Sequence, residues 1–141
     1  MQSRGMTLLE VIVVIAILGI LTAICIPKNT IRKYNLHSQA KLLTNEIRMI
    51  RYKTMTEGGS PIISLNRNNY KILEGSSHIK TVELGDNISL NNIVKMKKIR
   101  FSPSGSPRDA GSIRIEDKIT TDYYDITIVP YTGRVLLKEV D

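Results

Sequence analysis

A single carboxylate, Glu10, lies inside an apolar stretch and is the residue most in need of a chemical partner. The 21 residues from Met6 to Ile26 are otherwise apolar, Gly or Thr. As a helix they would rise about 1.5 Å each and extend roughly 30 Å, the hydrocarbon thickness of a bilayer. An acid at the centre of such a span costs about 2.5 to 3.5 kcal/mol, less near an edge, and usually has a partner. Glu10 therefore requires an explanation, either a partner or access to water at the helix end.

The other reactive side chains form no catalytic pattern. His37 and His78 lack metal-ligand spacing to one another or to Cys25. Ser104 lies in the Ser-, Gly- and Pro-rich segment 102–112, which has neither a nucleophile motif nor phosphate-binding glycine spacing. We therefore expect no metal, no cofactor and no enzyme. An extracellular enzyme held by a signal anchor is an alternative function, and it is disfavoured because the sequence contains no candidate catalytic site.

Length and charge indicate one small domain with a basic segment beside the apolar run. The 141 residues carry a net charge of +7. Segment 28–57 holds seven basic and two acidic residues, whereas segment 58–141 holds twelve basic and ten acidic ones. The basic segment could contact lipid headgroups, nucleic acid or acidic partners, although a solvated helix face is the commoner meaning. With one cysteine, no intramolecular disulfide can form.

The stretch "RGMTLLEVIVVIAILGIL" resembles the N-terminal signature of type IV pilins and type II secretion pseudopilins. These proteins have a short hydrophilic leader that ends in Gly, then a cut, then a hydrophobic helix with Glu as its fifth residue. By this resemblance Gly5 ends the leader, Met6 is the new N-terminus, Glu10 is the fifth residue and Pro27 is the helix-softening proline. Met6 is a departure, because the family most often has Phe there. The apolar run is too long for a secretory signal peptide, so we expect it to be retained.

The resemblance implies partners and a modification. Prepilin peptidase would cut between Gly5 and Met6, and the freed amine of Met6 would be N-methylated and remain positive. Glu10 could then pair with the N-terminus of a neighbouring pilin or pseudopilin inside an assembled bundle, which would relieve the cost of its burial. The alternative is an interfacial Glu10 that reaches water at the helix end.

The distribution of charge and the resemblance predict opposite membrane orientations. Only Arg4 precedes the apolar run, whereas Lys28, Arg32, Lys33 and Lys41 follow it, so the positive-inside rule alone places the C-terminal domain in the cytoplasm. The resemblance implies the reverse. We follow the resemblance, because it matches three specific positions, and expect a single-pass membrane protein with its C-terminal domain outside the cytoplasm.

The remaining chain reads as an amphipathic helix followed by strands. An apolar stripe at helical spacing ends at the glycines and proline of segment 57–61. Its members are Leu36, Ala40, Leu43, Ile47 and Ile50. Alternation of apolar and polar residues then predicts half-buried antiparallel strands. These strands are 62–66, 70–74, 78–85, 97–101, 112–116, 124–129 and 134–140.

These elements predict an α+β fold of the pilin type. One long helix, half of it transmembrane, would run from about Thr7 to Thr56 with a bend near Pro27, and its stripe would pack on a single apolar sheet face. The expected domains are a leader at 1–5, a transmembrane segment at 6–27, an amphipathic segment at 28–57 and an antiparallel β domain at 58–141.

A second resemblance concerns the C-terminus. Phe101, Gly105, "GSIRI" and "DITIVPYTGRVLL" resemble the H-type minor pseudopilins of type II secretion and the FimT-like minor pilins. This implies a minor subunit at or near the tip of a type IV pilus or of a secretion or competence pseudopilus. The alternative is a DNA-binding minor pilin acting in DNA uptake. Its candidate contacts are Arg134, Lys138, Lys95, Lys97, Lys98 and Arg100, although DNA affinity demands several phosphate contacts.

Overall fold

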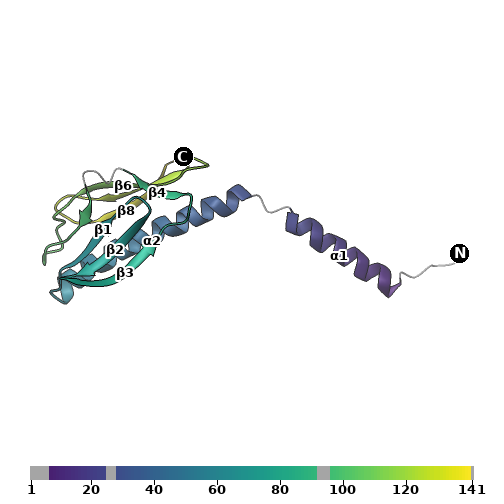
Figure 1. Ribbon diagram of the computed structural model, residues 1–141, viewed down its shortest axis with the longest axis horizontal. Helices are drawn as coiled ribbons and strands as arrows, with labels where there is room; N and C mark the ends of the chain where they lie inside the picture. The colour runs from purple at the N-terminus through teal and green to yellow at the C-terminus, as the bar shows by residue number, and fades with distance from the viewer. Residues whose placement is uncertain (1–6, 25–27, 92–95, 141) are drawn as a thin grey trace. The chain divides into compact units, whose positions relative to one another are not determined.

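The computed structural model describes residues 7–24, 28–91 and 96–140, and it confirms an α+β chain with antiparallel sheets. The chain divides into two compact units, Met1–Ile31 and Arg32–Asp141. Helix α1 spans Leu8–Ile24 and helix α2 spans Lys28–Thr56 (Figure 1). The strands are β1 (Pro61–Leu65), β2 (Asn69–Glu74), β3 (Ser77–Glu83), β4 (Ile88–Asn91), β5 (Lys98–Ile99), β6 (Gly111–Asp117), β7 (Tyr123–Ile128) and β8 (Val135–Val140).

The predicted membrane span at 6–27 is not found. Within the residues that the structure describes, no helix is both long and apolar enough to cross a bilayer. The predicted bend at Pro27 lies outside the described residues.

The inner face of α2 forms the centre of the core, as its apolar stripe predicts. Leu36, Ala40, Leu43 and Ile47 are fully buried, and Ile50 is 2% exposed. The helix ends at Thr56, before the glycines at which its end is predicted. The spacing of four and three therefore identified the buried face correctly.

The strands form two four-stranded sheets, which corrects the expectation of a single sheet. The first has the order β3-β2-β1-β5 and the second has the order β4-β6-β7-β8. All of their pairings are antiparallel. Alternation along a strand reports which side chains are buried, but it does not say which strands pair, so it could not separate one sheet from two.

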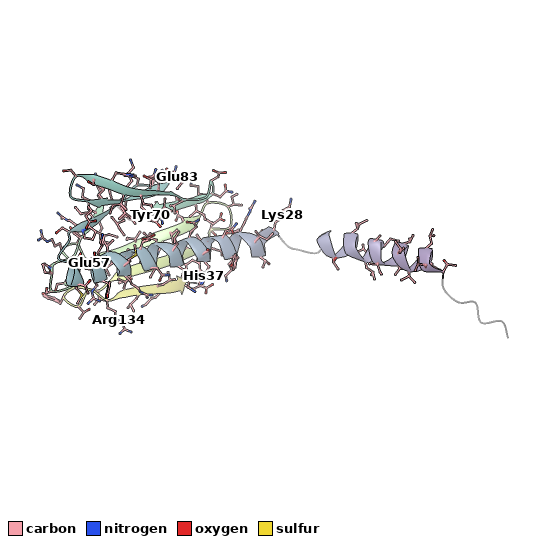
Figure 2. The ribbon with its side chains drawn as sticks, turned by 90° about the horizontal axis from the view of Figure 1, so that it is seen from below. Lys28, His37, Glu57, Tyr70, Glu83 and Arg134 are labelled. Carbon is pink, nitrogen blue, oxygen red and sulfur yellow. The ribbon has the colours of Figure 1, made fainter. Side chains whose placement is uncertain are left out.

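Figure 2 shows helix α2 running along the strands. Polar contacts along its two flanks tie it to both sheets. Towards the first sheet, Lys53 pairs with Glu74 of β2 at 2.9 Å. Towards the second, Arg48 donates to the carbonyl of Val135 of β8 at 3.0 Å. These ties fix the rotation of α2 about its own axis, so the same face always meets the sheets.

A buried acid joins α2 to the edge strand β3. Glu46 is 8% exposed, and its Oε1 accepts a hydrogen bond from Lys80 Nζ of β3 at 2.9 Å. An inward lysine on an edge strand discourages pairing with other chains. Tyr70 lies nearby and is fully buried. Its burial raises the pKa of its hydroxyl, and the negative charge of Glu46 raises this pKa further.

Strand β4 was not predicted. Its four residues alternate between apolar and polar types, but so short a run lies at the lower limit of a strand signal. Ser89 is buried although its type predicts exposure. The predicted strand at 97–101 is shorter than expected, since only Lys98–Ile99 is in strand β5. Phe101 forms an isolated bridge with Pro107 instead.

Two adjacent leucines provide a matched test of the orientation of α2. Leu43 is fully buried, whereas Leu42 is 39% exposed. We expect Leu43→Ala to lower the free energy of unfolding by about 2 to 5 kcal/mol because it leaves a cavity. Leu42→Ala should cost less than about 1 kcal/mol, because it removes little buried area. Equal losses in denaturant titrations of the two variants would contradict this orientation.

Candidate functional site

Glu10 lies in the first turn of α1, where it is exposed. Its backbone N–H donates to the carbonyl of Thr7 at 3.1 Å and lies 3.3 Å from the Thr7 hydroxyl. Thr7 and Glu10 thus have the spacing of a capping box, a signal that sequence reasoning missed. The acid also lies at the positive end of the helix dipole, which favours it. No side chain of the described residues bonds to its carboxylate.

The predicted cleavage site cannot be placed. Gly5 and Met6 lie outside the described residues.

The outward face of α2 carries a stripe without charge. We call it the outer stripe, and all of its members are exposed. They are Tyr34, Ser38, Leu42, Asn45, Met49, Tyr52 and Thr56. The intervals of three and four residues align them along one side of the helix. Tyr34, Met49 and Tyr52 are each more than half exposed, on a helix that otherwise carries many cations. Sequence reasoning missed this surface, because the inner stripe alone accounted for the helical period.

The predicted basic residues do not gather on one element. Lys97 and Lys98 are exposed at β5 of the first sheet, and Lys95 lies outside the described residues. Arg100 pairs with Asp109 at 3.1 Å. Its charge is therefore partly neutralised.

Lys138 belongs to β8 of the second sheet, in a cross-strand row of mixed charge. Arg114 pairs in register with Asp125, and Asp125 pairs in register with Lys138. Arg114 Nε lies 2.9 Å from Asp125 Oδ1. This hydrogen bond is the largest of the effects that raise the pKa of Arg114. Its guanidinium also lies 3.8 Å from the ring centre of Tyr123. A row that alternates in sign offers phosphate groups little attraction.

An ion pair between Lys33 and Glu139 holds the end of β8 to α2. Glu139 accepts from Lys33 at 2.9 Å. This hydrogen bond is the largest of the effects that lower the pKa of Glu139, and a hydrogen bond with Tyr124 lowers it further. Burial is the main cause that raises the pKa of the Tyr124 hydroxyl.

The Gly-Arg pair at 133 and 134 has a clear structural role. Gly133 has φ of +63°, and a Cβ there would overlap the carbonyl oxygen of Gly105. Arg51 of α2 donates to that carbonyl at 3.0 Å and to the carbonyl of Thr132 at 2.9 Å. The two loops and the helix therefore meet where only glycine fits. The side chain of Arg134 is exposed and bonds to no other part of the described chain.

Comparisons with known proteins support the N-terminal prediction. The family described as "Prokaryotic N-terminal methylation motif" matches residues 1–26. No curated protein matches the chain, and no solved structure matches it. The match covers the predicted leader, the predicted cleavage position and most of the apolar run, and it supports the coarse prediction of a pilin- or pseudopilin-like subunit.

Two glycines with similar positive φ angles test whether the close approach of Gly133 to the Gly105 carbonyl affects stability. Gly133 and Gly75 have φ of +63° and +60°, but a Cβ at Gly75 would meet nothing within 4 Å. Both Ala variants lose about 1 to 2 kcal/mol from the left-handed conformation. We expect Gly133→Ala to lose at least about 1 kcal/mol more, because the 105 loop and Arg51 must move. Thermal unfolding of the two variants measures the difference, and equal melting temperatures would refute the close approach.

Proposed function

We propose that the chain is a minor pilin or pseudopilin, processed by prepilin peptidase and incorporated at or near the tip of a type IV pilus or of a type II secretion or competence pseudopilus. The observation that carries the proposal is the methylation motif in residues 1–26. Before assembly the chain is anchored at the membrane, with its C-terminal domain outside the cytoplasm. It acts by assembly and not by catalysis.

The chemistry of assembly follows from one acid and one amine. Cleavage after Gly5 frees the amine of Met6, which stays positive after methylation. Glu10 has no partner in the described part of its own chain, so the amine of an adjacent subunit can pair with it. In surroundings of low dielectric such a pair is strong, whereas an unpaired carboxylate is costly. The pair therefore favours one register between neighbouring subunits.

The outer stripe supplies a second assembly surface. Its members present hydroxyl, amide, aromatic and thioether groups and no charge, so covering them requires no desolvation of an ion. Exposed apolar side chains aligned along a helix are typical of contacts with another helix. Tyr and Met are also enriched in protein interfaces. Helix α2 can therefore pack on both sides, with its inner face on the sheets and its outer stripe on a neighbouring subunit.

DNA binding is the weaker alternative. Arg134 and Lys138 remain exposed, but Lys97 and Lys98 belong to the other sheet and Arg100 is paired. Specific and non-specific DNA affinity both rise with the number of phosphates contacted at once. The dispersed arrangement supports the assembly role in preference to this one.

Substitution of Glu10 tests the proposed ion pair. We expect Glu10→Gln to be cleaved normally but to enter fibres at least about tenfold less, because one amine loses its anion. Glu57→Gln is a matched control, since Glu57 is an exposed acid beyond the end of α2. Quantitative immunoblots of sheared fibres and of whole cells measure incorporation. Normal incorporation of Glu10→Gln would contradict the pairing.

A further inference from the structure

The turn between β7 and β8 holds an exposed aromatic ring on a strained backbone. Tyr131 is 91% exposed, and its φ of +64° is unusual for a residue other than glycine. The N–H of Thr132 donates to the carbonyl of Pro130 at 2.7 Å, which closes a turn of three residues. A three-residue turn with positive φ at its centre is rare and strained.

Neighbouring side chains keep this turn in place. Ser106 Oγ donates to the carbonyl of Tyr131 at 2.9 Å, and Arg51 donates to that of Thr132 at 2.9 Å. Backbone strain persists where the surroundings impose it, and it is concentrated at functional sites. A tyrosine presented on a rigid backbone loses little entropy on binding, which is why tyrosines often anchor interfaces.

The surroundings of Tyr131 are basic. The adjoining loops 101–108 and 129–134 contain two cations and no acid. Both cations, Arg108 and Arg134, are exposed. We call Tyr131 and Arg134 the knob. Its charge favours an acidic partner surface.

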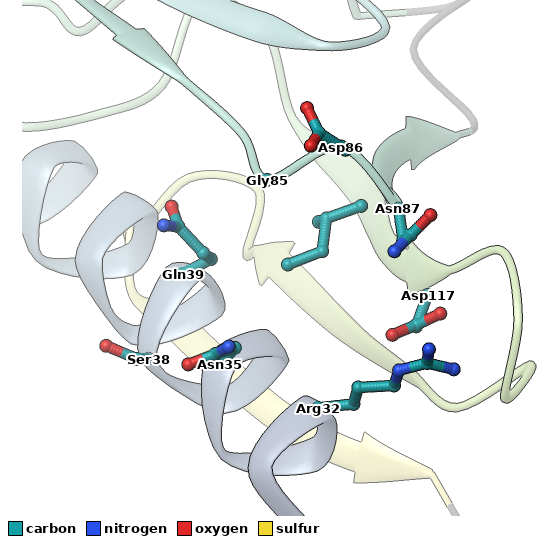
Figure 3. Close-up of a pocket in the computed structure, with 9 residues that line it drawn as sticks. Arg32, Asn35, Ser38, Gln39, Gly85, Asp86, Asn87 and Asp117 are labelled. Carbon is teal, nitrogen blue, oxygen red and sulfur yellow. The ribbon is translucent and has the colours of Figure 1, made fainter. Parts of the chain in front are cut away.

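A cavity of about 380 Å³ with polar and acidic walls lies elsewhere in the same unit. It is bounded by the first turns of α2, by the turn between β3 and β4 and by the end of β6 (Figure 3). Its walls include Arg32, Gln39, Asp86 and Asp117. We call it the socket, and its volume lies within the range of ligand sites.

The polar groups of the socket differ in accessibility. Asp117 is 4% exposed, and its Oδ1 accepts from the N–H of Ile119 at 2.7 Å. Gln39 Oε1 is buried as well. Asp86 is exposed at the rim and is the carboxylate that a cation can reach.

The knob and the socket lie at opposite ends of α2. Gln39 belongs to the socket, and Arg51 holds the knob. They are twelve residues apart in the sequence, about 18 Å along a helix. Figure 2 shows Arg134 near the Glu57 end of the helix. A knob therefore cannot enter the socket of its own chain, and contact with a second copy runs head to tail. A contact of this kind leads to an open row when the rotation does not close.

We propose that the knob of one copy occupies the socket of the next. Tyr131 enters the cavity, and Arg134 pairs with the exposed Asp86 at its rim. The inference rests on the proposed function, because it names this same chain as the neighbour in the fibre. It requires that copies adjoin, which a short run of a minor subunit satisfies.

Engineered cysteines test the contact in the full chain expressed in its own cells. In a Cys25→Ser background, Thr132→Cys, an exposed position beside the knob, is combined with Asn35→Cys, a residue of the socket wall. After mild oxidation we expect a ladder of dimers, trimers and longer species. Each single-cysteine variant should give no species beyond a dimer. Failure of the double variant to give a ladder, or cross-linking of position 35 only to a different protein, would overturn the proposal.

A charge exchange gives an independent reading in the same double-cysteine chain. We expect Arg134→Glu or Asp86→Arg to reduce the ladder at least about tenfold, and the combined variant to restore it to within about twofold. No recovery would contradict the pairing of Arg134 with Asp86. Fibre incorporation of the parent chain separates the two proposals. Incorporation without a ladder rejects only the knob and socket, whereas absence of the parent chain from fibres rejects the proposed function.

Discussion

The orientation of helix α2 is the constraint on which the rest of the structure depends. Five apolar side chains of its inner face are almost completely buried, and each large side chain buried in this way contributes about 1.5 to 3 kcal/mol. Polar ties to both sheets flank that face, as Lys53 with Glu74 and Arg48 with Val135 show. Rotation of the helix would expose the apolar groups and break both ties. The outer stripe is therefore presented to the surroundings as a consequence of core packing.

Two features of the described chain support the proposed assembly. Glu10 begins an apolar helix without a cationic partner in the described part of its chain, and the outer stripe exposes aromatic and thioether groups without charge. Each gains from contact with another subunit, one through charge pairing and the other through removal of apolar area from water. The methylation motif at residues 1–26 supports this role, and in the proposed mechanism processing frees the amine that pairs with Glu10. Local charge and burial thus agree with the proposed role.

Periodicity predicted the local elements well and the tertiary arrangement only in part. The inner stripe of α2 was identified from its spacing, because burial on one face leaves a period of 3.6 residues. Strand β4 was missed although its residues alternate between apolar and polar types, because a run of four residues is a weak signal. The role of Arg51 was also missed, because its carbonyl partners lie 54 and 81 positions away. The contact of Gly133 with the loop at Gly105 could not be derived from local sequence. Pairing between distant segments is set by three-dimensional packing, which a single sequence does not encode in any local pattern.

The N-terminus of the mature chain tests the central claim most directly, because the ion pair and assembly both require the amine of Met6. Mass spectrometry of the chain recovered from sheared fibres should identify a polypeptide that begins at Met6 and carries an N-methyl group. A chain in the fibre fraction that retains Met1–Gly5 would contradict the account.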